Sequence, residues 1–388
     1  VTKKRASCTD KRPASMRIGI DGREFLERRT GVGRYLGSLC EQWLKLECGR
    51  HEFVIYSPLP SDNLSALGPP FTKTASRFFR HQRVAGRTGT WWEQIQLPLA
   101  VNQDEVDVFF APAYSAPIQL SIPCVVTMHD VSFVAHPEWF RWREGLRRRW
   151  LASYAMRHAK AVITVSRFSK TEILRWFDVP AERVHVIHHG SSAELSSVDA
   201  YETLAPLPLI LYVGSIFNRR NLPTLIKAFA KVHTVIPDAQ LAIVGGNHTY
   251  PRQDLKAVVD QHEVGNQVSL YEYVADNELS TLYRQARVFV FLSEYEGFGL
   301  PPLEALSVGV PIILGDTSVA HEIYGDASLF VPHTDVAAIA ETIITLLRDN
   351  AVRSCQQSRA TELLPSFSWE RSAQHTLTVL ENAARSGR

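Results

Sequence analysis

The sequence predicts an α/β protein with two domains, each built on a parallel β-sheet. The 388 residues exceed the size at which one hydrophobic core usually stops growing. Short apolar runs rich in β-branched residues alternate with stretches of helical periodicity, as in parallel strands joined by crossover helices. Residues 191–208, rich in Ser, Ala and Pro and without periodicity, separate two such series and are typical of a linker.

The elements follow in chain order. The first series predicts strands at 16–21, 53–58, 106–112, 124–130, 161–166 and 184–190, and the second at 209–215, 241–246, 268–274, 288–294, 311–316 and 328–332. Helices are predicted at 221–236, at 276–286 with Asp276 as N-cap, and at 335–349. The two domains are therefore expected at 16–190 and 209–367. Residues 1–15 carry charge with no apolar segment behind it, and we expect a disordered tail there.

Composition excludes several classes of protein. A net charge of +2, from 42 basic and 40 acidic residues, gives no global reason to bind nucleic acid. The five cysteines are scattered without C-x-x-C spacing, which argues against a disulfide framework and a zinc site and favours the cytoplasm. No apolar run of about 18 residues and no signal-peptide pattern occur, so we expect neither a spanning helix nor secretion.

Two glutamates flank a glycine-rich stretch, "EGFGLPPLE", after the strand predicted at 288–294. Ligands of open parallel sheets bind beyond the carboxyl ends of the strands. Gly297 and Gly299 disfavour one continuous helix, so Glu296 is expected on the loop and Glu304 in or near the first turn of the next helix. The free N–H groups of a helix start suit phosphate, whereas carboxylates accept hydrogen bonds from hydroxyls. Together they suit a nucleotide sugar; the alternative is one capping and one surface glutamate.

Two further loops carry candidate binding residues. Arg219 and Arg220 precede a helix that opens near Asn221, and two guanidiniums there could hold a diphosphate; the alternative is a solvated helix start. Gly31 and Gly33 form a G-x-G immediately before a predicted helix. Without the rest of a dinucleotide fingerprint this is a weak signal, and an ordinary glycine turn is the alternative.

Histidines end two predicted strands. His129 and Asp130 follow the strand at 124–130 at a position expected to face a ligand cleft, although a structural histidine is an equal alternative. His185, His188 and His189 lack an identifiable third convergent ligand, so no metal site is predicted. No Asp-x-Asp pair follows a strand, and we expect arginines to take the place of a divalent ion at the diphosphate.

Residues 140–160 combine cations with a periodic apolar stripe. The cations are Arg141, Arg143, Arg147, Arg148, Arg149, Arg157 and Lys160, against the single acid Glu144, and the stripe is Trp142, Leu146, Trp150 and Tyr154. This pattern is typical of a helix on an anionic membrane surface. A core-packed helix with a solvated basic face is the equal alternative.

Several segments jointly resemble one family. They are "GVGRYL", "HDVSFVAHPEWF", "GSIFNRRNL", "SEYEGFGLPPLEALSVGVPII" and "SFSWERSAQHTL". Together they resemble the family 4 retaining glycosyltransferases (glycosyl transferases group 1), especially bacterial mannosyltransferase-like members, over nearly the whole chain from Met16. The E-x7-E motif of that family corresponds to Glu296 and Glu304. This sequence departs from the family in having Arg220 where lysine is usual, Glu272 where glycine is common and His321 where proline is common.

The resemblance implies a GT-B architecture: two Rossmann-like domains facing across a cleft, with 368–388 as a helix crossing back to the first domain. The N-terminal domain would take the acceptor and the C-terminal domain the nucleotide sugar. Glu296 would bind donor-sugar hydroxyls, Glu304 the ribose hydroxyls, and Arg219 and Arg220 the diphosphate, helped by backbone N–H groups near Phe298, Gly299 and Leu300. Gly31 and Gly33 would form a loop approaching the donor, His129 would contact the donor sugar with Asp130 beside it in the substrate site, and the base would lie near Tyr273 and Val274.

The resemblance also implies an activity. It is transfer of a hexose to an acceptor hydroxyl with retention of configuration and without a metal or other cofactor. Mannose from GDP-mannose is the favoured donor, and UDP- or ADP-linked glucose is the next alternative. The acceptor would be a cell-surface glycan or lipid-linked oligosaccharide, and the enzyme a cytoplasmic or peripheral membrane protein on the inner face of the plasma membrane. The alternatives are a catalytically inactive nucleotide-sugar-binding scaffold and a sugar-nucleotide epimerase.

Overall fold

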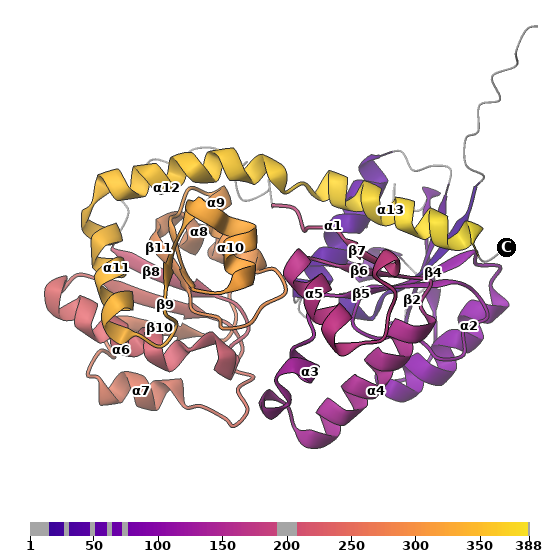
Figure 1. Cartoon of the computed structure of the whole chain (residues 1–388), viewed down its shortest axis with the longest axis horizontal. Helices are drawn as coiled ribbons and strands as arrows, with labels where there is room; N and C mark the ends of the chain where they lie inside the picture. Colours follow the sequence, from indigo (N-terminus) through magenta and orange to yellow (C-terminus); the bar gives the residue numbers. More distant parts are fainter. Residues whose placement is uncertain are drawn as a thin grey trace, which may run out of the picture. The chain divides into compact units, whose positions relative to one another are not determined.

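The computed structural model describes residues 15–26, 31–46, 51–59, 64–71, 77–191 and 208–386. Within them the chain forms two parallel β-sheets with helices between the strands, which confirms the predicted α/β class (Figure 1). The predicted tail at 1–15 and linker at 191–208 fall almost wholly outside the described residues. Both therefore stay predictions.

The first sheet has seven strands in the order β3-β2-β1-β4-β5-β6-β7. These strands are β1 Arg17–Asp21, β2 Glu52–Ser57, β3 Phe79–Arg83, β4 Val108–Ala111, β5 Cys124–Met128, β6 Ala161–Thr164 and β7 Val184–Val186. β1 pairs in parallel with β2 on one side and β4 on the other. The strand order therefore reverses at β1, the kind of position where α/β sheets bind ligands.

The second sheet has six strands in the order β10-β9-β8-β11-β12-β13. They are β8 Leu209–Val213, β9 Gln240–Val244, β10 Val268–Tyr271, β11 Ala286–Phe291, β12 Ile312–Gly315 and β13 Ser328–Val331. The central strands are fully buried, as expected of parallel strands covered by helices on both faces. The order reverses at β8 and β11, which places the loops after these two strands side by side.

The helices follow the strands in turn. They are α1 Gly31–Lys45, α2 Leu97–Gln103, α3 Ser132–Ala135, α4 Trp142–His158, α5 Arg167–Trp176, α6 Leu222–Val235, α7 Leu255–Gln261, α8 Asp276–Gln285, α9 Leu300–Ser307, α10 Ser318–Tyr324, α11 Val336–Arg348, α12 Asn350–Leu363 and α13 Trp369–Arg385. A π-helix, Trp92–Gln96, precedes α2, and a 3₁₀ turn, Asn218–Arg220, precedes α6. No helix of the described residues is long and apolar enough to cross a membrane.

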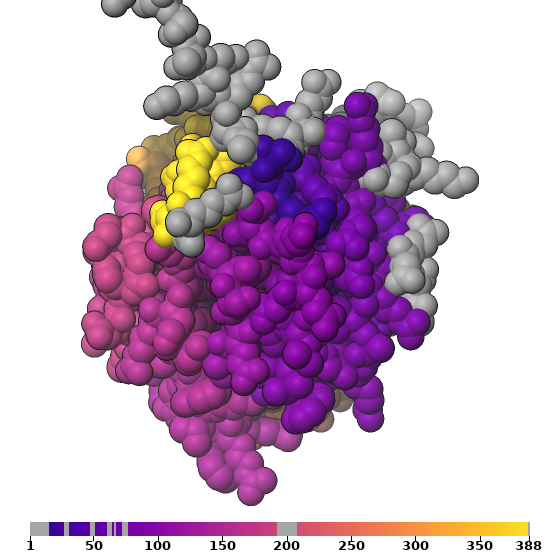
Figure 2. Space-filling model, turned by 90° about the vertical axis from the view of Figure 1, so that its right-hand side faces the viewer, coloured from indigo at the N-terminus to yellow at the C-terminus, as the bar shows by residue number. Residues whose placement is uncertain are grey.

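By contacts the chain divides into two compact units, the first comprising residues 1–112, 117–125 and 377–388. Its core stacks the rings of Trp43 and Phe53 with their centres 5.0 Å apart, and those of Phe53 and Phe79 4.6 Å apart. Figure 2 shows the last turns of α13, in yellow, beside the indigo start of the chain. A buried hydrogen bond of 3.0 Å between His51 and Glu381 ties these turns to β2.

The second unit comprises residues 113–116 and 126–376, and it contains the six-stranded sheet. In Figure 1, α6 and α7 lie on one side of this sheet and α8, α9 and α10 on the other. The apolar face of α6, including Ile226 and Phe229, is fully buried. At full burial, each such side chain stabilises the fold by roughly 1.5 to 3 kcal/mol.

Three local expectations are wrong. β3 was not predicted, because the sequence "FRHQR" is polar and only Phe79 and His81 turn inward on this strand at the sheet edge. Asp276 is the first residue of α8 rather than its N-cap, which is Ala275 in extended conformation. Gly31 and Gly33 lie in the first turn of α1 rather than before it, because the helix needs that turn to bring Tyr35 against the core.

Candidate functional site

The two predicted glutamates lie at the carboxyl end of β11. Glu296 is on the loop between β11 and α9, as predicted, and Glu304 is on α9. Gly299 precedes α9 with a φ of 95°, a left-handed conformation that favours glycine. Because α9 begins at Leu300, Glu304 lies just beyond the first turn, as expected. The N-cap Gly299 has no side chain to cap α9, and Pro301 and Pro302 in the first turn have no N–H group, so this helix start offers few backbone donors.

Glu296 is held by two short hydrogen bonds. Arg220 Nε donates to Glu296 Oε1 over 2.8 Å, and the Ser293 hydroxyl donates to the same oxygen over 2.8 Å. Burial acts to lower the pKa of Arg220, but the attraction of Glu296 outweighs it and raises the pKa above its ordinary value. Arg220 is therefore charged, and the ion pair fixes the carboxylate that the sequence assigns to sugar hydroxyls.

Arg220 also hydrogen-bonds to β8 and to the loop that follows it. Its Nη1 donates to the Ser215 carbonyl over 2.6 Å and to the Tyr212 hydroxyl over 3.4 Å. Gly214 makes room for it, because a Cβ there would lie 2.6 Å from Nη1. The resemblance implies that both arginines hold the diphosphate, which stays a prediction, and the structure also joins Arg220 to Glu296.

Arg219 has different surroundings. Arg219 is only 9% exposed. Its Nε is buried and has no hydrogen-bond partner among the described residues. The guanidinium carbon lies 4.5 Å from the ring centre of Phe217 and 5.7 Å from that of Trp139. The Arg219 carbonyl accepts from Glu294 N–H over 3.0 Å, which ties the arginine's backbone to the loop that carries Glu296.

Glu304 is almost fully buried and accepts a hydrogen bond of 2.9 Å from the Tyr283 hydroxyl. Burial raises the pKa of Tyr324 well above its ordinary value, and the charges of Glu296 and Glu304 raise it further. Tyr324 therefore lies near both carboxylates, and its hydroxyl donates to the Gly299 carbonyl. Sequence reasoning assigned no role to these tyrosines or to Ser293, because only the fold brings their hydroxyl groups to the glutamates.

His129 and Asp130 are buried just after β5. Asp130 accepts hydrogen bonds from Ser132 N–H over 2.8 Å and from the Tyr114 hydroxyl over 3.0 Å. Burial acts to raise the pKa of Asp130, but the charge of Arg219 and these hydrogen bonds outweigh it, so the pKa lies below its ordinary value. The His129 carbonyl faces Gly297 so closely that a Cβ there would lie 1.8 Å from it. The structure thus places His129 and Asp130 beside the loop that carries Glu296.

The other histidines point to separate neighbours. His189 packs against Phe298 and His129, with ring centres 4.8 and 5.7 Å apart, and burial with nearby histidine charge lowers its pKa well below the ordinary value. His188 Nε2 instead lies 3.7 Å from a carboxylate oxygen of Glu322. Among the residues that the structure describes, no group of three or more His, Cys, Asp or Glu side chains could hold a metal ion.

Some of the remaining predicted site residues lie beside Glu296, and others do not. Phe298 and Gly299 lie beside Glu296 on the loop, and Leu300 opens α9. Val274 is buried after β10, whereas Tyr273 beside it is exposed. Gly31 and Gly33 belong to the first unit, and each unit is described by itself. Their predicted approach to the donor stays a prediction.

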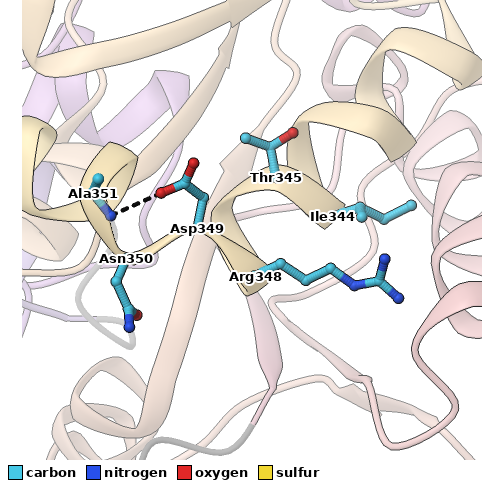
Figure 3. Close-up of a pocket in the computed structure, with 6 residues that line it drawn as sticks. All are labelled: Ile344, Thr345, Arg348, Asp349, Asn350 and Ala351. Atoms are coloured by element: carbon cyan, nitrogen blue, oxygen red, sulfur yellow. Dashed lines mark hydrogen bonds between the residues drawn. The ribbon is translucent and has the colours of Figure 1, made fainter.

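A separate hollow of about 570 Å³ lies where α11 meets α12 (Figure 3). It is lined by Ile344, Thr345, Arg348, Asp349, Asn350 and Ala351. Asp349 accepts a hydrogen bond of 2.8 Å from Ala351 N–H and so caps α12. None of the predicted site residues lines this hollow.

The loops after β8 and β11 combine two kinds of recognition. Two carboxylates, the partly buried Glu296 and the buried Glu304, can accept hydrogen bonds from hydroxyl groups. A buried cation with an unused donor, Arg219, can hold an anion. A ligand with hydroxylated rings and phosphates satisfies both.

Two family models match the chain. Glycosyltransferase Family 4 matches residues 29–195, and Glycosyl transferases group 1 matches residues 202–362. O-antigen chain mannosyltransferase B of Escherichia coli is 31% identical over 285 residues, covering 70% of this chain and 73% of that protein. O-antigen chain mannosyltransferase RfbU of Salmonella typhimurium is 30% identical over 211 residues, covering 54% of this chain and 57% of that protein.

Solved structures share the fold over almost the whole chain. Sucrose-phosphate synthase of Thermosynechococcus elongatus has a TM-score of 0.74 at 19% identity, covering 96% of this chain and all of that chain. WaaG, a glycosyltransferase involved in lipopolysaccharide biosynthesis, has a TM-score of 0.69 at 16% identity, covering 95% of this chain and 99% of that chain. At these identities the likeness concerns the fold alone.

Proposed function

This chain belongs to the glycosyl transferases group 1 family and has the GT-B architecture, and from this premise we propose that it transfers a hexose from a nucleoside diphosphate sugar to an acceptor hydroxyl with retention of configuration. Mannose from GDP-mannose is the favoured donor, because O-antigen chain mannosyltransferases are among its relatives. The acceptor would be a growing cell-surface glycan or a lipid-linked oligosaccharide.

The observation that carries the proposal is the state of Arg219. A buried guanidinium whose Nε has no acceptor is costly unless an anion completes its bonds. Glu296 and Glu304 flank the same loop system and would repel a bare phosphate. They would instead accept hydrogen bonds from the sugar and the ribose of a nucleotide sugar.

In the proposed reaction the bond between the sugar and the diphosphate breaks and the acceptor oxygen bonds to the sugar carbon. Arg219 would stabilise the negative charge that develops on the leaving diphosphate. Glu296, held by Arg220 and Ser293, would orient the sugar through its hydroxyls. The departing diphosphate would take the acceptor proton on the same face. Because arginine supplies the charge, we propose that no metal ion is needed.

The alternatives have less support. No relative described above is an epimerase, and an inactive scaffold would have no need to keep both glutamates of the E-x7-E motif and the buried arginine. Turnover is the property that separates an enzyme from a scaffold, and the experiment below therefore includes it.

The test is calorimetric titration with GDP, UDP and ADP in the presence of EDTA, followed by incubation with GDP-mannose and nuclear magnetic resonance detection of GDP release. We expect preferential GDP binding without metal, slow release of GDP in water and α-configured product with a mannoside acceptor. Preference for UDP or ADP would change the donor, and binding only after Mg²⁺ is added would overturn metal independence. Binding with no turnover in water or with mannoside, glucoside and galactoside acceptors would favour the scaffold.

We also propose that the enzyme works as a peripheral protein at the inner, anionic face of the plasma membrane, through α4. Trp142, Leu146 and Trp150 are 70%, 56% and 59% exposed, so the stripe does not pack into the core. Exposed Arg143 and Arg147 border the stripe. Large apolar side chains bordered by cations suit the headgroup region of anionic lipids.

Vesicle flotation tests this surface. We expect the wild-type protein to float with vesicles that contain phosphatidylglycerol and phosphatidylcholine but not with phosphatidylcholine alone, and to be released by salt. The double variant Trp142→Ser/Trp150→Ser should stay in solution. Trp176→Ser is the matched control, because Trp176 is also exposed but hydrogen-bonds the carboxylate of Glu172. If flotation does not depend on the anionic lipid, or if the double variant still floats, α4 is not the membrane-binding element.

A further inference from the structure

We propose that Phe217 and Trp139 are positioning residues that hold the Arg219 guanidinium by their ring faces and so keep its N–H donors free for the donor diphosphate. Arg220, in contrast, serves as the fixed partner of Glu296. The inference rests on the proposed function, because it concerns how the same site takes the diphosphate.

The two neighbouring arginines differ in how their donors are used. Arg220 donates to Glu296, to Ser215 and to Tyr212. No side-chain hydrogen bond of Arg219 is found among the residues that the structure describes, and its Nε is buried. A guanidinium has five N–H donors; Arg220 uses those on Nε and Nη1, whereas the Arg219 side chain uses none toward the described residues, so Arg219 keeps more donors for a ligand.

Ring faces can hold a cation without consuming its donors. The guanidinium carbon of Arg219 lies 4.5 Å from the Phe217 ring centre and 5.7 Å from the Trp139 ring centre. Both distances are within the roughly 6 Å over which an aromatic quadrupole attracts a cation. Because this attraction acts on the charge through the ring face, the N–H groups at the guanidinium edge stay available.

Asp130 does not take these donors. Its carboxylate accepts from Ser132 and Tyr114, so its attraction to Arg219 acts at longer range. If a carboxylate held Arg219 directly, that ion pair would have to break before a diphosphate could bind. A ring-held arginine avoids that cost, and the rings should therefore contribute to diphosphate affinity.

Stepwise fluorination of the Phe217 ring tests whether the ring face contributes to GDP affinity. Phe217 is replaced site-specifically by mono-, di- and trifluorophenylalanine, since each fluorine weakens the ring quadrupole with little change of shape. GDP affinity is then measured calorimetrically with EDTA present. We expect the Kd to rise at each step, by roughly 2- to 30-fold over the series. Phe217→Tyr should bind GDP almost as the wild type does, and Phe217→Leu should bind more weakly.

Phe291 is the matched control, because its ring centre lies 4.8 Å from the guanidinium carbon of Arg220. The Phe217 ring also lies 5.5 Å from Arg220, so the control isolates the contribution of Arg219. Arg220 is fixed by hydrogen bonds, and the same fluorine series at Phe291 should leave the GDP Kd unchanged. Trp139→Leu should weaken GDP binding less than Phe217→Leu, since Trp139 is more distant.

The outcomes separate the inference from the proposed function. A Phe217 series with a flat Kd would overturn the inference even if GDP binds, as would a loss in Phe217→Leu without dependence on fluorine. Equal losses in the Phe291 series would overturn the division between the two arginines. Failure of the wild-type protein to bind GDP, UDP or ADP would instead refute the proposed function on which the inference rests.

Discussion

Glu296, which we propose binds the donor sugar, is also the counter-ion of Arg220. Arg220 donates to it over 2.8 Å in a position where both side chains are largely shielded from water. Removing one partner of such a pair leaves the other charge buried without compensation. Arg219 makes no such ion pair with the described residues, and the buried carboxylate that its charge stabilises, Asp130, keeps its hydrogen bonds from Ser132 and Tyr114 when Arg219 is removed. Substitution of Glu296 should therefore destabilise the fold more than substitution of Arg219, even if both residues are needed for transfer.

We expect Glu296→Ala to lower the free energy of unfolding by about 3 kcal/mol and to lower kcat/KM by about 100-fold or more. Arg219→Ala should lower kcat/KM by a similar factor while changing the free energy of unfolding by less than about 1 kcal/mol. Urea denaturation and GDP release from GDP-mannose measure the two quantities. Equal destabilisation by both variants would mean that the Arg220–Glu296 pair contributes little to the fold.

The residues that the sequence made predictable are those whose chemistry is unusual at a strand end. Glu296, Glu304 and Arg219 stand out for this reason, and the resemblance adds their roles. Tyr283 and Tyr324 carry no local signal, because they meet the glutamates only through the fold. The sequence also could not separate Arg219 from Arg220, since two adjacent guanidiniums differ only in the partners that distant residues provide.

At the scale of elements, the loop between β11 and α9 depends on a close backbone approach. A Cβ at Gly297 would lie 1.8 Å from the His129 carbonyl oxygen, far inside contact distance. The neighbour is backbone and cannot turn away as a side chain could. Any larger residue at this position must therefore move the loop, and with it Glu296 and the start of α9.

We expect Gly297→Ala to lower kcat/KM by about 100-fold or more, because small displacements of positioning groups cost that much in rate. Gly145→Ala is the matched control: a Cβ there would meet Phe140 at an ordinary 3.5 Å, within α4. It should keep the activity in solution and gain roughly 0.5 to 1 kcal/mol in stability. A Gly297→Ala enzyme with normal turnover of GDP-mannose would show that the loop tolerates the shift.

The strands were predictable where they are apolar and buried. The expected runs correspond to strands in both sheets, because parallel strands covered on both faces need continuous apolar sequence. β3 was not predicted because a strand at the sheet edge can carry polar residues that face solvent. The helix starts at Asp276 and Gly31 were misplaced by one to a few residues, since caps depend on backbone conformation that composition does not specify.

At the scale of the whole molecule, recognition of the donor and attachment of the last helix lie in different units. Arg219, Glu296 and Glu304, which are proposed to bind the donor, lie in the second unit. The last turns of α13 belong to the first unit, where Glu381 hydrogen-bonds His51. The resemblance, which extends over nearly the whole chain, gave the GT-B architecture, but it could not show that this buried pair holds the helix end.

This separation makes a testable distinction between stability and donor binding. Glu381→Ala removes the acceptor that His51 Nε2 contacts over 3.0 Å, at a site where both residues are buried. We expect a loss of about 2 kcal/mol in the free energy of unfolding and an unchanged Kd for GDP, measured by thermal denaturation and calorimetry. Glu370→Ala is the control, because this exposed carboxylate on the same helix should change stability by less than about 0.5 kcal/mol. A weaker GDP affinity in Glu381→Ala would contradict the separation, since it would mean that the helix end of the first unit supports the loops after β8 and β11.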